Sequence, residues 1–149
     1  KYENIKCCIM GNGPYNKRLI KISKILNVQK NVHFTGQVSN KKKLKILKSS
    51  KIFVLPGNGG LAINDAMFAG LPIIYTRADG TEKYLLKNRL NGLFFRENNV
   101  SDLVKKIDFL LKNNSRGEIM GKISKKMILG KININYVIKN FQKALEAKI

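Results

Sequence analysis

Short apolar runs alternate with longer amphipathic stretches over much of the chain. The runs are rich in β-branched residues and are bounded by glycine, proline or asparagine, which is typical of strands. We predict strands at Ile5–Met10, Val32–Thr35, Ile52–Leu55, Pro72–Thr76 and Gly92–Phe95. Periodic apolar positions predict helices at Pro14–Leu26, Lys41–Lys48, Leu61–Phe68, Thr81–Lys87, Val100–Asn113, Ser115–Met127 and Ile134–Ala147. Such β/α alternation predicts an α/β fold, a doubly wound parallel sheet with helices on both faces and the last helices packed around it.

Length and composition set limits on this fold. With 149 residues, 44% of them hydrophobic, the chain suffices for one domain, and we predict a single unit over residues 1–149. A strand follows soon after Lys1, so we expect the domain to begin upstream. No apolar run reaches the roughly 20 residues of a membrane-spanning helix. Cys7 and Cys8 are interpreted as reduced core residues of a cytosolic protein. With His33 the only histidine, we expect no metal site.

The formal net charge of +20 has three interpretations. Lysines outnumber arginines throughout the chain, which favours solvated surface lysines that reflect an AT-rich genome. Attraction to an anionic membrane face is the second interpretation, through lysine clusters at residues 41–48 and 122–131. Nucleic-acid binding ranks last and is not expected, because the aromatic residues that would stack on bases are not interleaved with the basic ones.

Four turns at the carboxyl ends of predicted strands carry the candidate chemistry. They are Gly11–Pro14, Gly36–Val38, Gly57–Gly60 and Arg77–Thr81. In one parallel sheet these turns share an edge, where glycine backbone and helix N-termini favour a phosphate group. Glycine is also common in such turns for steric reasons alone. The four together predict a nucleotide-type site.

Two acidic residues near these turns allow alternative roles. Asp65 lies one turn into the helix after the Gly57–Gly60 turn, where it is suited to accept the two hydroxyls of a ribose. The simpler alternative is a partly exposed carboxylate near a positive helix end. Glu82 follows Asp79 by three residues, which matches a helix capping box.

Five collinear motifs run along the chain: Val32–Val38, Lys51–Pro56, Gly60–Pro72 with Asp65-Ala66-Met67-Phe68-Ala69-Gly70, Gly80-Thr81-Glu82, and Asn91-Gly92-Leu93. Together they resemble the C-terminal, donor-binding domain of family 4 retaining glycosyltransferases, the group 1 glycosyl transferases of the GT-B fold. They cover nearly the whole chain in order. The resemblance implies a Rossmann-like domain that forms one half of a GT-B fold, with the acceptor domain outside this chain.

The resemblance also implies a nucleotide-sugar site, with a UDP-sugar the expected donor and no other cofactor. The residues expected to bind the donor are Gly11, Gly13, Val38, Gly57, Asn58, Gly59, Gly60, Leu61, Asp65, Arg77, Gly80 and Thr81. In that family the acid at the place of Asp65 holds the ribose, and Glu82 falls at the family's Gly-x-Glu position. The family usually has a second acid eight residues before Asp65, where this chain has Gly57. We therefore assign no catalytic residue from the sequence.

The implied parent protein transfers a hexose, with retention, to a glycan or lipid-linked acceptor held by the other domain. Its expected setting is bacterial polysaccharide or lipopolysaccharide synthesis in the cytoplasm. The alternative location is peripheral, at the inner face of the membrane. This chain alone is expected to bind nucleotide weakly without turnover. The alternatives are a non-catalytic or degenerate nucleotide-binding module and a GT-B-type nucleotide-sugar epimerase.

Overall fold

The computed structural model describes residues 2, 4–77, 80, 82–131 and 134–146. The chain divides into two units, Lys1–Lys45 and Ile46–Ile149. Its elements run in the order β1 (Cys7–Met10), α1 (Asn16–Ile25), β2 (Val32–Gly36), α2 (Asn40–Ser49), β3 (Phe53–Leu55), α3 (Ala62–Ala69), β4 (Ile73–Tyr75), α4 (Glu82–Leu85), β5 (Gly92–Phe94), α5 (Val100–Lys112), α6 (Asn114–Lys131) and α7 (Ile134–Glu146). Each predicted strand and helix is present, within a few residues of its expected bounds.

The first unit holds a two-stranded parallel sheet. β1 pairs with β2, with Cys7 opposite Val32 and Cys8 opposite His33, and the register shifts between Ile9 and Met10. Both cysteines are exposed, so the prediction that they are core residues is wrong. The reason is that β1 has one strand partner, and its first residues are covered on neither face.

The second unit holds a three-stranded parallel sheet in the order β3-β4-β5. The registers of the two pairs agree, because Leu55 lies opposite Tyr75 and Tyr75 opposite Phe94. The three strands therefore end at the same level, and the segments that follow them leave the sheet at one edge. β4 is buried throughout, as expected of a central parallel strand.

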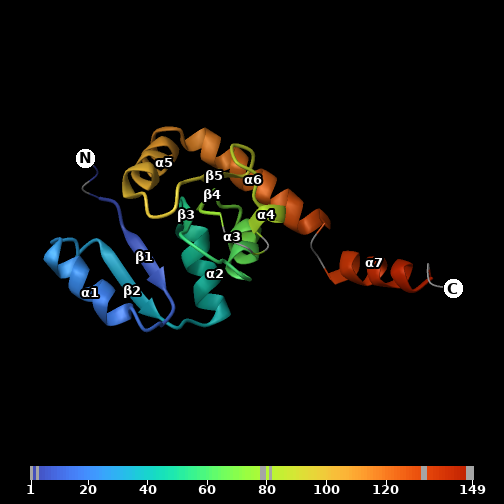
Figure 1. Ribbon diagram of the computed structural model, residues 1–149, viewed down its shortest axis with the longest axis horizontal. Coiled ribbons are helices and arrows are strands. Elements are labelled where there is room, and N and C mark those ends of the chain that lie inside the picture. Colours follow the sequence, from blue (N-terminus) through green and yellow to red (C-terminus); the bar gives the residue numbers. More distant parts are fainter. Residues whose placement is uncertain (1, 3, 78–79, 81, 132–133, 147–149) are drawn as a thin grey trace. The chain divides into compact units, whose positions relative to one another are not determined.

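Helices cover both faces of this sheet (Figure 1). One core cluster packs β4 against α3 and α4, and includes Ile63, Met67, Ile73 and Leu85. The other packs the opposite face against α5 and α6, and includes Ile74, Leu93, Leu110 and Met120. The predicted parallel α/β class, with helices on both faces, is confirmed.

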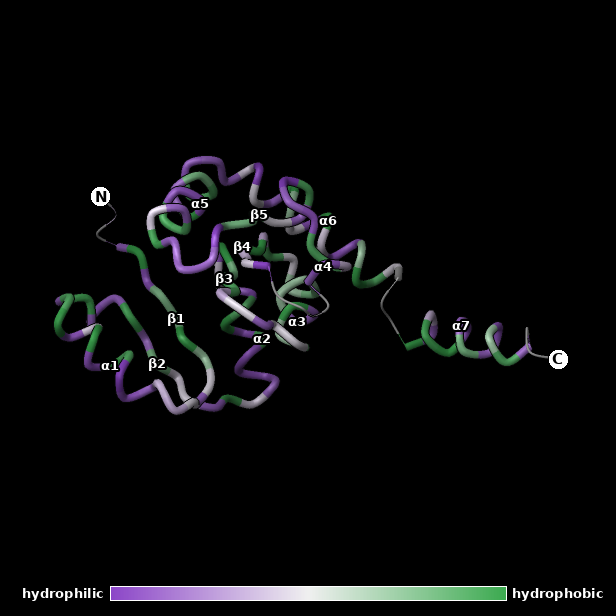
Figure 2. Tube along the Cα trace, viewed as in Figure 1, coloured by the Kyte–Doolittle hydropathy of each residue, from purple (hydrophilic) through white to green (hydrophobic). Residues whose placement is uncertain are grey.

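Two features differ from the expected arrangement. The strands that the structure describes pair as two sheets, β1-β2 and β3-β4-β5, and one sheet through residues 1–149 stays a prediction. The expectation that all the last helices pack around the sheet holds for α5 and α6, but α7 buries none of its residues. Figure 2 shows the alternation of apolar and polar residues along α7. That alternation predicted the helix correctly and its burial wrongly.

Candidate functional site

A glycine-rich loop, which we call the glycine loop (residues 56–61), joins β3 to the N-terminus of α3. Gly60 has a φ of +47°, and Leu61 after it is 79% exposed. A Cβ atom built on Gly57 or on Gly60 would have no heavy atom within 4 Å. The backbone on this part of the loop is thus open to the approach of a ligand. The N-terminus of α3 adds the positive end of a helix dipole.

Gly59 is a glycine for a different reason. A Cβ atom there would lie 2.5 Å from Leu55 Cδ2 and 2.7 Å from Ile63 Cγ1, so packing beneath the loop excludes a side chain. Its N–H donates a 2.6 Å hydrogen bond to Glu82 Oε1, and its carbonyl accepts from the N–H of Ala62 at 3.0 Å. Both backbone groups of Gly59 are therefore engaged within the protein, whereas the sequence predicts Gly59 as a ligand contact.

The carboxylate of Glu82 is 2% exposed and reaches the glycine loop from the start of α4. The capping-box hypothesis placed this side chain at the N-terminus of its own helix. In the described residues its hydrogen bond goes to Gly59, and Asp79 lies outside those residues. Oε2 of Glu82 is also buried and has no hydrogen-bond partner among the residues that the structure describes. A Cβ atom on Gly80 would lie 2.6 Å from that oxygen.

Asp65 lies on α3 after the glycine loop, and Arg77 follows β4 at the same edge of the sheet. Asp65 is half-buried in the first turn of α3, where its N–H donates to the carbonyl of Leu61 at 3.2 Å. Arg77 is exposed, and its guanidinium carbon lies 5.5 Å from the centre of the Phe94 ring. Burial raises the pKa of the Tyr75 phenol, and the Arg77 charge opposes that rise. Asp65 and Arg77 thus bring a carboxylate and a cation to this edge.

Three predicted site residues belong to the first unit. Gly11 has a φ of +109° and donates its N–H to the carbonyl of Gly36 at 2.9 Å. The carbonyl of Gly13 accepts from Asn16 at the start of α1, and neither glycine has a heavy atom within 4 Å of a built Cβ. Val38 is half-buried. A common site with the second unit stays a prediction, and Thr81 lies outside the described residues.

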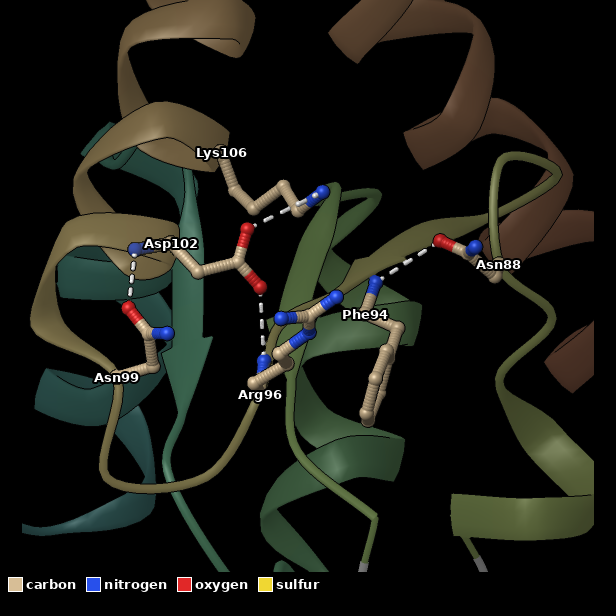
Figure 3. A network of polar contacts seen from close by, with 6 residues as sticks. All are labelled: Asn88, Phe94, Arg96, Asn99, Asp102 and Lys106. Atoms are coloured by element: carbon tan, nitrogen blue, oxygen red, sulfur yellow. Dashed lines mark hydrogen bonds and ion pairs between the residues drawn. The ribbon is translucent and has the colours of Figure 1, made fainter.

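A polar network at the carboxyl end of β5 was not predicted as a site (Figure 3). Asn99 caps α5 by accepting from the N–H of Asp102, and Asp102 Oδ2 accepts from the N–H of Arg96 at 2.9 Å. That bond is the main reason that the pKa of Asp102 is lowered, and Lys106, 3.5 Å from Oδ1, adds to it. These residues line an open pocket of about 460 Å³.

In the part of the chain that the structure describes, no three His, Cys, Asp or Glu side chains gather as a metal site would require. Within those same ranges no helix has the length and apolar character needed to cross a membrane.

Comparison with known proteins places this geometry in a family. The model of the family described as glycosyl transferases group 1 matches residues 1–127. An uncharacterized glycosyltransferase of Haemophilus influenzae is 30% identical over 119 residues, which are 76% of this chain and 32% of that protein. The chain spans 25–37% of the length of the curated relatives it matches.

Solved structures agree on the fold. Anabaena HepE in complex with UDP superposes with a TM-score of 0.85 at 15% identity, over 97% of this chain and 42% of that one. The C-terminal domain of the group 1 family protein LpcC from Francisella tularensis gives a TM-score of 0.75 at 19% identity, over 90% of this chain and 73% of that one. The fold is that of GT-B glycosyltransferases, and the chain belongs to the glycosyl transferases group 1 family.

Proposed function

We propose that this chain is the donor-binding, C-terminal domain of a retaining glycosyltransferase that uses a nucleotide sugar. The observation that carries the proposal is the open backbone at Gly57 and Gly60, placed at the carboxyl end of β3 and the N-terminus of α3. Membership of the group 1 family supports it. HepE, which shares the fold, has been solved with UDP and with UDP-glucose, and we extend a UDP-sugar donor to this chain on that basis.

In this proposal the diphosphate lies over the open part of the glycine loop. Unpaired N–H groups and the α3 dipole would stabilise its charge, and the Arg77 guanidinium, which lies over the Phe94 ring, would add a cation. Asp65, one turn further along α3, would accept hydrogen bonds from the ribose hydroxyls. The first-unit residues Gly11, Gly13 and Val38 would contact the rest of the nucleotide.

Turnover is assigned to the longer protein. The loop has no carboxylate at position 57, so the second unit offers electrostatic stabilisation of the leaving diphosphate rather than a nucleophile or base there. Because transfer needs donor and acceptor in near-attack geometry, the acceptor must be held by residues outside this chain. We propose a hexose donor and a glycan or lipid-linked acceptor, in bacterial polysaccharide or lipopolysaccharide synthesis on the cytoplasmic face, with the lysine-rich surface toward anionic lipid.

Calorimetric titration of this chain with UDP tests the donor site. Asp65→Asn should weaken UDP binding by roughly tenfold, the scale of a hydrogen-bonded charge. Asp108→Asn is the matched control, because Asp108 pairs with Lys112 on α5 and should not affect binding. Equal affinity of the Asp65→Asn variant and the wild type would contradict the ribose role.

Assay of the longer protein tests the reaction. Incubation with UDP-, GDP- and ADP-hexoses should give transfer from one of them, and NMR of the product should show the anomeric configuration of the donor retained. Binding without transfer or hydrolysis would instead support a degenerate nucleotide-binding module.

A further inference from the structure

We propose that Glu82 is a positioning residue that holds the glycine loop in its ligand-binding shape. The proposal rests on the function proposed above and adds a residue that acts through the loop. It concerns two segments that follow neighbouring strands, since the loop follows β3 and Glu82 opens the helix after β4.

The bond between the two segments is short. Glu82 Oε1 lies 2.6 Å from the backbone nitrogen of Gly59, below the usual range of N–H···O hydrogen bonds. The side chain is 2% exposed, so water competes little for the carboxylate. A buried carboxylate is costly unless it is hydrogen-bonded, and this bond to the loop is the one that offsets the cost.

Gly59 is fixed from three directions. Leu55 and Ile63 lie beneath it, its carbonyl is bonded to Ala62 at the start of α3, and its N–H is bonded to Glu82. The open residues Gly57 and Gly60 lie two positions before it and one after it. Fixing Gly59 therefore sets the direction of the backbone groups that remain free for a diphosphate. Without the carboxylate, the N–H of Gly59 would turn toward water and the loop would lose one of its anchors.

The other carboxylate oxygen of Glu82, Oε2, lies against Gly80. Oε2 is buried, and Gly80 is the residue whose side chain would collide with it. Because Gly80 has no side chain, there is room for the Glu82 carboxylate. Gly80, which the sequence predicts as a donor-binding residue, therefore has a packing role. The Glu82 carboxylate therefore contacts Gly59 through Oε1 and lies against Gly80 through Oε2.

Three variants separate positioning from simple packing. Glu82→Gln keeps an oxygen that can accept from Gly59, Glu82→Asp shortens the reach by one methylene, and Glu82→Ala removes the contact. NMR of the whole chain should show the Gly59 amide proton far downfield in the wild type, less so in the Gln variant, and at an ordinary position in the Asp and Ala variants. UDP affinity should follow the same order, with a loss of about tenfold for Glu82→Ala.

Two controls distinguish this from general destabilisation. Tyr84→Ala changes an 80% exposed residue of the same helix and should leave both readouts unchanged. Leu110→Ala removes a buried side chain of α5 on the opposite face of the sheet and should lower stability while UDP affinity stays within twofold. Loss of UDP binding equal to that of Glu82→Ala in the Leu110 variant would overturn the proposal, as would an unchanged Gly59 amide in Glu82→Ala. If the wild type binds no UDP, GDP or ADP, the proposed function fails, and the positioning role, which rests on it, is overturned with it.

Discussion

Helix α6 contains two buried glycines that should respond oppositely to the same substitution. At Gly121 a Cβ atom would collide with the carbonyl oxygen of Gly70, the residue that ends α3 in a left-handed conformation. At Gly117 the nearest atoms are Pro72 Cγ at 3.5 Å and Leu110 Cδ2 at 3.8 Å, which is ordinary contact. Gly121→Ala should therefore destabilise the chain, and Gly117→Ala should stabilise it.

The magnitudes follow from two opposing effects. Replacing glycine by alanine inside a helix stabilises by up to about 1 kcal/mol. Overpacking costs about 1–3 kcal/mol, and the upper end applies to Gly121 because the colliding atom belongs to the backbone. We expect a net loss of about 1–2 kcal/mol for Gly121→Ala and a gain of up to about 1 kcal/mol for Gly117→Ala.

Urea unfolding followed by far-ultraviolet circular dichroism measures both variants against the wild type. For a chain of this size each kcal/mol corresponds to roughly 2–4 °C in Tm, so thermal melts give a second readout. Gly130→Ala, with no heavy atom within 4 Å of the added Cβ, controls for solvent-exposed helix propensity. If Gly121→Ala were as stable as Gly117→Ala, the close packing of α6 on the end of α3 would be refuted.

Two further predictions concern polar side chains of the second unit. Because the folded chain lowers the pKa of Asp102 below its ordinary value of 3.8, its stabilising contribution is present above that pH and is lost as the pH falls through the lower value. The urea midpoint of the wild type should thus fall more steeply in acid than that of Asp102→Asn, and parallel curves would contradict this. Asn91, 0% exposed, donates to the carbonyl of Leu85 and accepts from the N–H of Lys87. Asn91→Ala should cost about 2–3 kcal/mol in urea unfolding, and a loss below 0.5 kcal/mol, typical of surface positions, would show that these bonds contribute little.

Local signals were sufficient for the elements of the fold. Gly70 and Pro72 predicted the end of α3 and the start of β4, because a left-handed glycine and a proline stop a helix through their own backbones. The continuous apolar run at residues 72–75 predicted a strand, and β4 lies there. Such features depend on residues a few positions apart, which is the range that a sequence pattern describes.

Contacts between segments that are far apart in the sequence could not be predicted from such local patterns. Glu82 matched a local capping box, yet its partner is Gly59, 23 positions earlier. The cysteines and α7 have patterns that normally indicate burial, but burial depends on which surfaces lie against them. Gly59 and Gly80 were expected to contact a ligand, whereas the structure gives each a packing reason for having no side chain.

A two-dimensional NMR titration of this chain tests the central claim most directly. UDP, GDP and ADP would be added in turn at moderate salt, with an unrelated polyanion as the control for the +20 charge. A donor site at this edge should give saturable shifts from one nucleotide, centred on the glycine loop, Asp65 and Arg77, with further shifts at Gly11, Gly13 and Val38. Equal shifts of the lysine-rich faces with every polyanion, and none in the glycine loop, would contradict the proposed donor site.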